Sequence, residues 1–243
     1  MNIAGSVALV TGANRGIGRS FVDELLERGA AKVYAAVRRP DAVPADEFPD
    51  PRVEVLRLDL LDDATVTDAA AHATDVTLLV NNAGITTGSN LLGTDDLAGV
   101  RRELDTHFWG TLGVIRAFAP VLAANGGGAI VNVNSALSWF STNGANGYAV
   151  AKAAEWAMTN GVRLELAAQG TLVQALHLGA ADTDMMARYD GPKIAPRAVA
   201  AASLDGVESA AIEVLADDWS RLVKSSLAND PSEFYAEALA PRA

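Results

Sequence analysis

The stretch that decides the fold is VALVTGANRGIG, residues 7–18. A short apolar run is followed at once by a glycine-rich turn, and residues 20–28 then have amphipathic helical character that stops at Gly29. Strand, glycine turn and helix in this order predict a βα unit whose turn can bind a phosphate group, because a helix N-terminus offers backbone N–H groups and a positive dipole. A plain βα turn without a ligand is the alternative.

The three glycines of the turn have separate roles in this prediction. Gly12 allows the tight turn, Gly16 lets the backbone approach a pyrophosphate, and Gly18 lets the helix pack closely on the strand. Their spacing, Gly-x3-Gly-x-Gly, differs from the common Gly-x-Gly-x-x-Gly. The predicted cofactor contacts in the turn are Gly12, Asn14, Arg15, Gly16, Ile17 and Gly18.

Beyond the turn, strand and helix patterns alternate to the end of the chain. Further strands are expected at residues 32–37, 52–58, 76–80, 128–135, 171–178 and 212–216, and helices at 62–73, 95–124, 148–168 and from Pro196 onward. Residues 40–51 carry four prolines and are expected to form a loop. This alternation predicts the α/β class, with one doubly wound parallel sheet and helices on both faces, in a single domain of residues 1–243.

Composition narrows the class of protein. Of 243 residues, 50% are hydrophobic and 20% are charged, which suits a soluble globular domain. The net charge of -11 argues against a nucleic-acid or anionic-membrane surface. The sequence contains no cysteine, its three histidines lack metal-ligand spacing, and we expect no metal site. The N-terminus resembles no signal peptide and no apolar run reaches ~18 residues, so we expect a cytoplasmic location.

The second strand ends in Arg38-Arg39 rather than in an acidic residue. An Asp or Glu at this place would bind the ribose 2′-hydroxyl of NAD, whereas an arginine accommodates the 2′-phosphate of NADP. Arg15, inside the glycine turn, could reach the same phosphate through a bidentate contact. The sequence therefore predicts NADP as cofactor, with NADPH preferred over NADH. Any one of these arginines alone would more often be a solvated surface charge.

Two other strand ends are candidate cofactor contacts. Asp59 and Leu60 follow the third strand and are plausible neighbours of the adenine. The fourth strand ends in Asn81-Asn82-Ala83-Gly84, whose small residues suit a backbone that a cofactor approaches closely. The contacts expected here are Asn82, Ala83 and Gly84, and the alternative is a simple turn.

Ser135, Tyr148 and Lys152 are the candidate catalytic group. Ser135 comes at the carboxyl end of a buried strand, and Tyr148 and Lys152 are four residues apart at the start of a helix, where i and i+4 share one face. A phenol is a poor acid at neutral pH, but a nearby ammonium favours the phenolate and brings its pKa toward the working pH. The group is thus suited to moving a proton to or from a substrate oxygen. The alternative is that Ser135 caps a turn and Lys152 is a solvated charge.

In this order, the glycine turn, Asn81-Asn82-Ala83-Gly84, Ser135 and Tyr148-x3-Lys152 resemble the short-chain dehydrogenases/reductases over essentially the whole chain. The resemblance implies a Rossmann-fold, NAD(P)-dependent oxidoreductase acting on a carbonyl/alcohol pair as a homodimer or homotetramer. It implies that Tyr148 is the acid/base, that Ser135 holds the substrate oxygen, and that Lys152 binds the nicotinamide ribose and lowers the tyrosine pKa. It further implies cofactor contacts from Tyr148, Lys152, Gly179 and Thr183.

Two positions depart from the family pattern. His107 stands where the family usually has an asparagine whose backbone carbonyl holds a water of a proton relay. The ring could pass protons itself, so His107 is counted with the catalytic candidates, or it could merely fill space. Leu178 replaces the proline of the usual Pro-Gly pair, which could loosen the loop through Met186.

The expected substrate pocket, formed by residues 136–147 and 179–210, is apolar and aromatic. Its candidates are Ala136, Leu137, Trp139, Phe140, Met185, Met186 and Tyr189, some of which could instead be core or subunit interface. An apolar lining favours a hydrophobic ketone or aldehyde, a small-molecule partner, and hence an NADPH-dependent carbonyl reductase. The alternatives are a 3-oxoacyl thioester reductase, for which a basic docking patch would be expected, and a non-catalytic NADP-binding sensor or scaffold.

Overall fold

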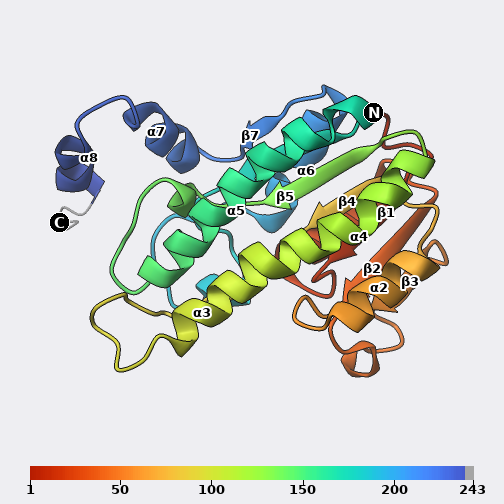
Figure 1. Ribbon diagram of the computed structural model, residues 1–243, viewed down its shortest axis with the longest axis horizontal. Coiled ribbons are helices and arrows are strands. Elements are labelled where there is room, and N and C mark those ends of the chain that lie inside the picture. Colours follow the sequence, from red (N-terminus) through yellow and green to blue (C-terminus); the bar gives the residue numbers. More distant parts are fainter. Residues whose placement is uncertain (239–243) are drawn as a thin grey trace.

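Seven parallel strands form one sheet in the order β3-β2-β1-β4-β5-β6-β7 in the computed structural model, which describes residues 1–238 (Figure 1). The strands are β1 (Val7–Thr11), β2 (Lys32–Val37), β3 (Val53–Arg57), β4 (Leu78–Asn81), β5 (Ala129–Val133), β6 (Leu172–His177) and β7 (Glu213–Leu215). The prediction of a doubly wound parallel sheet is confirmed. The strand order reverses between β1 and β4, and ligands of such sheets bind outside the strand ends at this point. Residues 239–243 of the predicted domain lie outside the described residues.

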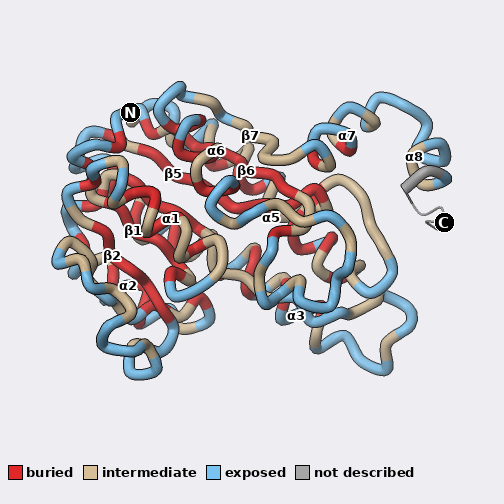
Figure 2. The backbone as a smooth tube through the Cα atoms, turned by 180° about the vertical axis from the view of Figure 1, so that it is seen from behind, coloured by how far each residue is buried: buried red, intermediate tan, exposed pale blue. Residues whose placement is uncertain are grey.

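Helices cover both faces of the sheet, as predicted (Figures 1 and 2). The helices α1 (Gly16–Glu27) and α6 (Pro196–Glu208) pack on one face, and α2 (Asp63–His72), α4 (Thr111–Ala124) and α5 (Asn146–Glu165) pack on the other. Neighbouring strand residues point to opposite faces: Val10 joins the first core with Phe21, whereas Leu9 joins the second with Phe118. The strands are therefore buried on both sides, which explains their almost continuous apolar runs.

Local signals in the sequence place several helix starts correctly. The Asp62 side chain accepts a hydrogen bond of 3.2 Å from the Ala64 N–H and caps α2, and Pro196 is the first residue of α6. The helix after the glycine turn begins at Gly16, however, four residues before its predicted start at residue 20. Gly16 and Gly18 consequently form its first turn, where the N–H groups available to an anion are found.

The helical stretch predicted at 95–124 is interrupted. It consists of α3 (Ala98–Leu104), a π-helical turn at Asp105–Gly110 and α4. A π-helical turn inside a helix is rare and occurs frequently at functional sites, and this one contains His107. By length and composition alone the 27 residues Ala98–Ala124 could cross a membrane. Core helices of globular proteins pass the same test, and Phe118 and Leu122 are fully buried.

The carboxyl-terminal helices extend from the body beside the loop that follows β5 (Figures 1 and 2). They are α7 (Asp218–Ser226) and α8 (Pro231–Ala238). Phe140 of the loop contacts Trp219 of α7 and Phe234 of α8, with ring centres 5.8 and 5.4 Å apart. The Ser141 N–H donates a 3.0 Å hydrogen bond to the Tyr235 hydroxyl. These contacts hold the two helices against the expected pocket wall.

Candidate active site

Tyr148 and Lys152 lie on one face of α5, beside the carboxyl end of β5. Helix α5 begins at Asn146, so Tyr148 is in its first turn and Lys152 is one turn further on. The Lys152 Nζ is 5.8 Å from the centre of the Tyr148 ring. Ser135 follows β5 by two residues, and its Oγ accepts a 3.1 Å hydrogen bond from the Leu137 N–H. The structure thus brings Ser135, Tyr148 and Lys152 together at one place. In the sequence they span 17 positions.

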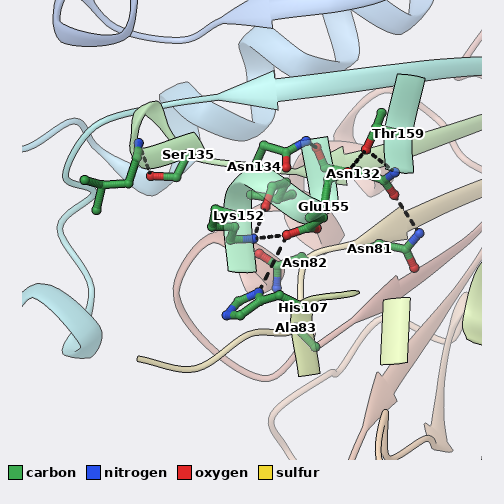
Figure 3. A network of polar contacts seen from close by, with 12 residues as sticks. Asn81, Asn82, Ala83, His107, Asn132, Asn134, Ser135, Lys152, Glu155 and Thr159 are labelled. Carbon is green, nitrogen blue, oxygen red and sulfur yellow. Dashed lines mark hydrogen bonds and ion pairs between the residues drawn. The ribbon is translucent and has the colours of Figure 1, made fainter. Parts of the chain in front are cut away.

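The Lys152 ammonium is buried and has two partners in the protein (Figure 3). Its Nζ donates to the Val133 carbonyl at 2.7 Å and to Oε2 of Glu155 at 2.6 Å. The Glu155 side chain is 2% exposed, so the ion pair is shielded from water. Sequence reasoning missed Glu155, although its position three residues after Lys152 puts it on the same helix face.

His107 reaches this pair from the π-helical turn (Figure 3). Its Nε2 is 2.8 Å from the Ile85 carbonyl oxygen and 3.3 Å from the Ile85 N–H. On the other side of the ring, Nδ1 lies 3.6 Å from Glu155 Oε2. The ring also stands edge-on to Tyr148, at 5.2 Å between centres and an angle of 90°. His107 therefore packs against the candidate catalytic tyrosine.

Gly84 is what leaves room for this histidine. A methyl group at position 84 would come within 2.5 Å of the His107 Cε1. The glycine that the sequence suggests as a cofactor contact thus also accommodates the imidazole that replaces the family's asparagine. The larger side chain at position 107 fits because position 84 has no side chain.

The three ionisable side chains set one another's protonation. Burial raises the pKa of Tyr148, and although Lys152 acts in the opposite direction, Glu155 adds to the rise. Lys152 lowers the pKa of the phenol, as expected, but burial and Glu155 outweigh it. The expectation that the pKa of Tyr148 moves toward neutrality is therefore wrong. Burial lowers the pKa of Lys152 but the carboxylate outweighs it, and the pKa of Glu155 is held below its ordinary value by Lys152 against the effect of burial. The site holds a phenol, an ammonium and a carboxylate.

Buried amides and a hydroxyl connect this site to the centre of the sheet (Figure 3). The Asn81 amide of β4 donates to the Asn132 side chain of β5 at 2.8 Å, and Asn132 donates to the Thr159 hydroxyl at 2.9 Å. Thr159 in turn donates to the Glu155 backbone carbonyl at 2.7 Å. This chain of contacts fixes α5 on the strands that carry the site. Asn132 and Thr159 were not recognised from the sequence, where they show no local pattern.

The glycine turn after β1 is connected to the end of β4 by Asn82. The Asn82 amide donates to the Thr11 carbonyl at 2.9 Å, and the Thr11 hydroxyl accepts from the N–H groups of Asn82 and Ala83 at 2.9 and 3.0 Å. A Cβ at Gly18 would lie 2.2 Å from the Gly12 carbonyl oxygen. The close packing predicted for Gly18 is thus present, and the side chain of Asn82 supports the turn.

The arginines expected at a 2′-phosphate differ in their surroundings. Arg15 forms a 3.2 Å ion pair with Asp184, and both side chains are exposed. Arg38 is exposed just beyond the end of β2 and forms no ion pair within residues 1–238. Thr183 lies against the glycine turn, since a Cβ on Gly16 would be 3.0 Å from its methyl group. The glycine turn and the 179–186 loop therefore lie against each other, and the glycines and first helical N–H groups of the turn fit a dinucleotide phosphate.

The remaining cofactor candidates make hydrogen bonds or packing contacts with nearby backbone and with neighbouring elements. Asp59 accepts a 3.1 Å hydrogen bond from the Leu61 N–H, and Leu60 is buried against Gly110. The Gly179 N–H donates to Asp217 at 2.7 Å, which connects the loop after β6 to the start of α7. Leu178, in place of the family's proline, is buried in the core and its carbonyl accepts from the Ala136 N–H at 2.8 Å. The loop is thus anchored at its beginning.

The predicted pocket residues do not all share one surface. Trp139 stacks on His177 at 3.9 Å between ring centres, with Lys224 4.6 Å from its ring, and Ala136 is buried at the start of the 3-10 turn after β5. Leu137 is half-buried beside Ser135, and Met185 and Met186 lie in a 3-10 turn (Asp184–Met186) next to the glycine turn. Tyr189 lines an open hollow of about 520 Å³ with Lys193. Of these candidates, Leu137 contacts Ser135 through its N–H, whereas Phe140 packs on α7 and α8.

Comparison with known proteins agrees with this geometry. The family described as short chain dehydrogenase matches residues 6–192. A crystal structure of a short chain dehydrogenase from Burkholderia cenocepacia in complex with NADP superposes with a TM-score of 0.92 at 38% identity, covering 99% of this chain and 100% of that one. A 3-oxoacyl-[acyl-carrier-protein] reductase from Vibrio harveyi is 31% identical over 189 residues, which is 76% of this chain and 77% of the relative.

A short chain dehydrogenase from Monascus purpureus is 33% identical over 194 residues, covering 74% of this chain. The match spans 66% of that relative's own length. The chain belongs to the short-chain dehydrogenase family, and it has the Rossmann-type fold and the Tyr-x3-Lys pair of an oxidoreductase in that family.

Proposed function

We propose that this protein reduces a hydrophobic ketone or aldehyde to the alcohol, with NADPH as the hydride donor. The observation that carries the proposal is the arrangement of the site: Tyr148, Ser135 and a buried Lys152–Glu155 ion pair lie together beside the carboxyl end of β5, and burial raises the pKa of Tyr148, which favours the phenol. A phenol is the form that donates a proton to a carbonyl oxygen, whereas oxidation of an alcohol requires the phenolate. The apolar side chain of Leu137 beside Ser135 favours a substrate without charge.

NADP is supported as the cofactor by two independent features. Arg38 is exposed and unpaired within residues 1–238 at the strand end where an acidic residue would bind NAD. The Burkholderia cenocepacia relative, 38% identical over nearly the whole chain, was crystallised with NADP. Arg15, which pairs with Asp184 in this structure, is a second guanidinium for the same phosphate once that exposed pair opens.

Each side chain has a definite part in the proposed reaction. The bound cofactor supplies the hydride that forms the new C–H bond. The Tyr148 hydroxyl gives its proton to the substrate oxygen, and the Ser135 hydroxyl orients that oxygen by hydrogen bonding. The Lys152 ammonium, held by Val133 and Glu155, stabilises the phenolate left on Tyr148. His107 holds the Ile85 backbone under the tyrosine.

Reduction of a 3-oxoacyl thioester is the second candidate. It is favoured by the Vibrio harveyi relative, a 3-oxoacyl-[acyl-carrier-protein] reductase at 31% identity. An acidic carrier protein would need a basic surface for docking, and the net charge of -11 gives this chain little general attraction for one. We therefore rank it below reduction of a free hydrophobic ketone. For either substrate we propose a cytoplasmic homodimer or homotetramer that binds neither nucleic acid nor membrane.

NADPH oxidation by the purified protein against a matched panel of substrates tests the proposal. The panel contains aryl ketones, alkyl ketones, aldehydes and a 3-oxoacyl thioester, each assayed with NADPH and with NADH. We expect the highest kcat/KM for an uncharged apolar ketone with NADPH. Preference for the thioester would establish the second candidate. Tight NADPH binding without turnover of any panel member would instead support the sensor or scaffold.

A further inference from the structure

Glu155 is a buried carboxylate in the active site that touches Lys152 but has no contact with the substrate in the proposed reaction. It is 2% exposed, and its Oε2 lies 2.6 Å from Lys152 Nζ and 3.6 Å from His107 Nδ1. Burying a carboxylate is costly unless it is paired, so a Glu at this position needs a partner that repays its desolvation. Figure 3 shows the carboxylate between the ammonium and the imidazole. Its position makes Lys152 that partner.

We propose, resting on the reductase function above, that Glu155 is a positioning residue of this site: its carboxylate anchors the Lys152 ammonium and keeps the Tyr148–Lys152 pair in the fully protonated form that reduces a carbonyl. Lys152 has only 4% of its surface exposed and depends on protein partners for its solvation. The Val133 carbonyl supplies a dipole and Glu155 supplies the opposite charge. Without the carboxylate, burial would favour the neutral amine.

Other ionisable groups face the pair from the elements packed around α5. Glu103 of α3 is fully buried, with Oε1 2.6 Å from the Thr87 N–H, and adds a second negative charge. His107 approaches from the π-helical turn, and His177 of β6 is buried beside Ser135 with its pKa lowered to about 4. His177 is thus neutral at pH 7. Glu155 is the carboxylate in direct contact with Lys152.

The proton balance of the reaction leaves Glu155 unchanged. The Tyr148 O–H bond breaks and an O–H bond forms on the product alcohol, and bound NADPH would supply the hydride for the C–H bond and leave as NADP⁺. Tyr148 keeps the electron pair as a phenolate beside Lys152, and it regains a proton from solvent before the next turnover. Removing the carboxylate makes the first proton of the Tyr148–Lys152 pair leave more easily, whichever of the two groups loses it, because a negative charge disfavours deprotonation of its neighbours.

The test is the pH profile of NADPH-dependent reduction for wild type, E155D and E155Q. E155Q keeps the shape of the side chain without its charge, and E155D keeps the charge but moves it one methylene away from Lys152. We expect the alkaline limb to move to lower pH in E155Q and to an intermediate position in E155D. Reduction at a pH on the wild-type alkaline limb should fall about tenfold in E155Q, the size expected for loss of one adjacent charge.

The matched control is E24Q. Glu24 of α1 is also a mostly buried carboxylate, paired with Arg28 and Arg197 on the opposite face of the sheet. Its replacement changes the net charge equally and should leave the limb in place. Coincident limbs for wild type and E155Q would overturn the proposal even if E155Q were slower. If E155Q does not fold, an E155D limb that coincides with that of wild type would overturn it as well.

A second readout separates this inference from the proposed function. The ultraviolet absorbance of tyrosinate, as the difference between a protein and its Y148F variant, reports the ionisation of Tyr148 without any substrate. When residue 155 is Gln, we expect the tyrosinate absorbance to appear at lower pH. If Lys152 loses its proton first, we expect instead that Tyr148 and Lys152 ionise at separate pH values. This experiment remains decisive if no ketone of the panel is reduced. An unchanged tyrosinate transition would contradict the role of Glu155 and say nothing against the reductase.

Discussion

The Tyr148 ring stands edge-on to the His107 ring, with 5.2 Å between their centres and an angle of 90°. This contact places an imidazole where relatives of this chain are expected to have an asparagine. The ring fits because Gly84 has no side chain, and it is oriented by the Ile85 carbonyl. The most conspicuous departure of the sequence from its family is therefore accommodated by packing, and Tyr148, Lys152 and Ser135, the proposed acid–base group, stay together beside it.

The H107N variant tests whether the imidazole fills space or passes protons. We expect the pH–rate profile to keep its shape and kcat to be retained, because Nε2 contacts the Ile85 backbone at 2.8 Å and Nδ1 is 3.6 Å from Glu155, beyond hydrogen-bond distance. Stability should fall by about 1 kcal/mol, since the partly buried Ile85 backbone loses its contact with the ring. Thermal unfolding and the reduction profile measure the two effects. A shifted or missing limb would show that the ring is part of a proton relay.

Replacing Tyr148 by phenylalanine should abolish turnover while NADPH still binds. The change removes the proton donor and leaves the glycine turn intact, so kcat should fall by at least about 10²–10⁴-fold. NADPH fluorescence titration measures binding, and steady-state NADPH oxidation measures turnover. Y34F is the matched control, because Tyr34 is a buried tyrosine of β2 that hydrogen-bonds Lys32 and Asp75 outside the site. Substantial activity in Y148F would mean that another group donates the proton.

R38D should weaken NADPH binding far more than NADH binding. A guanidinium–phosphate contact contributes about 1.5–3 kcal/mol, so its loss should raise the Kd for NADPH about 10- to 100-fold. Titration of both cofactors measures the ratio, and R116D, an equal change of charge on the exposed surface of α4, is the control. Equal losses for NADPH and NADH would show that Arg38 does not contact the 2′-phosphate.

His177 should make the fold less stable in mild acid. Burial lowers its pKa from 6.5 to about 4 in the folded protein. Between these values the unfolded chain binds a proton that the folded protein does not, so the free energy of unfolding falls as pH falls from about 6.5 to about 4. The contribution amounts to about 2 kcal/mol at pH ~5.

Urea unfolding of wild type and H177Q at pH ~7 and ~5 measures this contribution. H177Q is expected to be less stable at neutral pH, because it loses the stacking on Trp139 and the contact with the Ser135 carbonyl. The difference from wild type should shrink by about 2 kcal/mol at the lower pH. A difference that is the same at both pH values would show that His177 does not lose its proton on folding.

The sequence by itself determined the sheet, the glycine turn and the Tyr148–Lys152 pair. Each of these depends on a pattern of residues that lie close together along the chain. A strand shows its apolar run, a helix its spacing, and two residues four apart share a helix face whatever surrounds them. Asp62 and Pro196 were placed as helix starts for the same reason. The reversal of strand order then follows from ordinary connection rules.

Only the tertiary structure decided how the site is charged. Glu155 meets His107 across 48 positions of sequence, Asn81 meets Asn132 across 51, and Trp139 stacks on His177 across 38. The sign of the net pKa change of Tyr148 depends on burial and on Glu155 as well as on Lys152, and burial is not visible in a local pattern. The π-helical turn at His107 likewise could not be predicted, because the sequence pattern of residues 95–124 is that of an uninterrupted helix. Such contacts are set by how helices pack on the sheet, which no short stretch of sequence encodes.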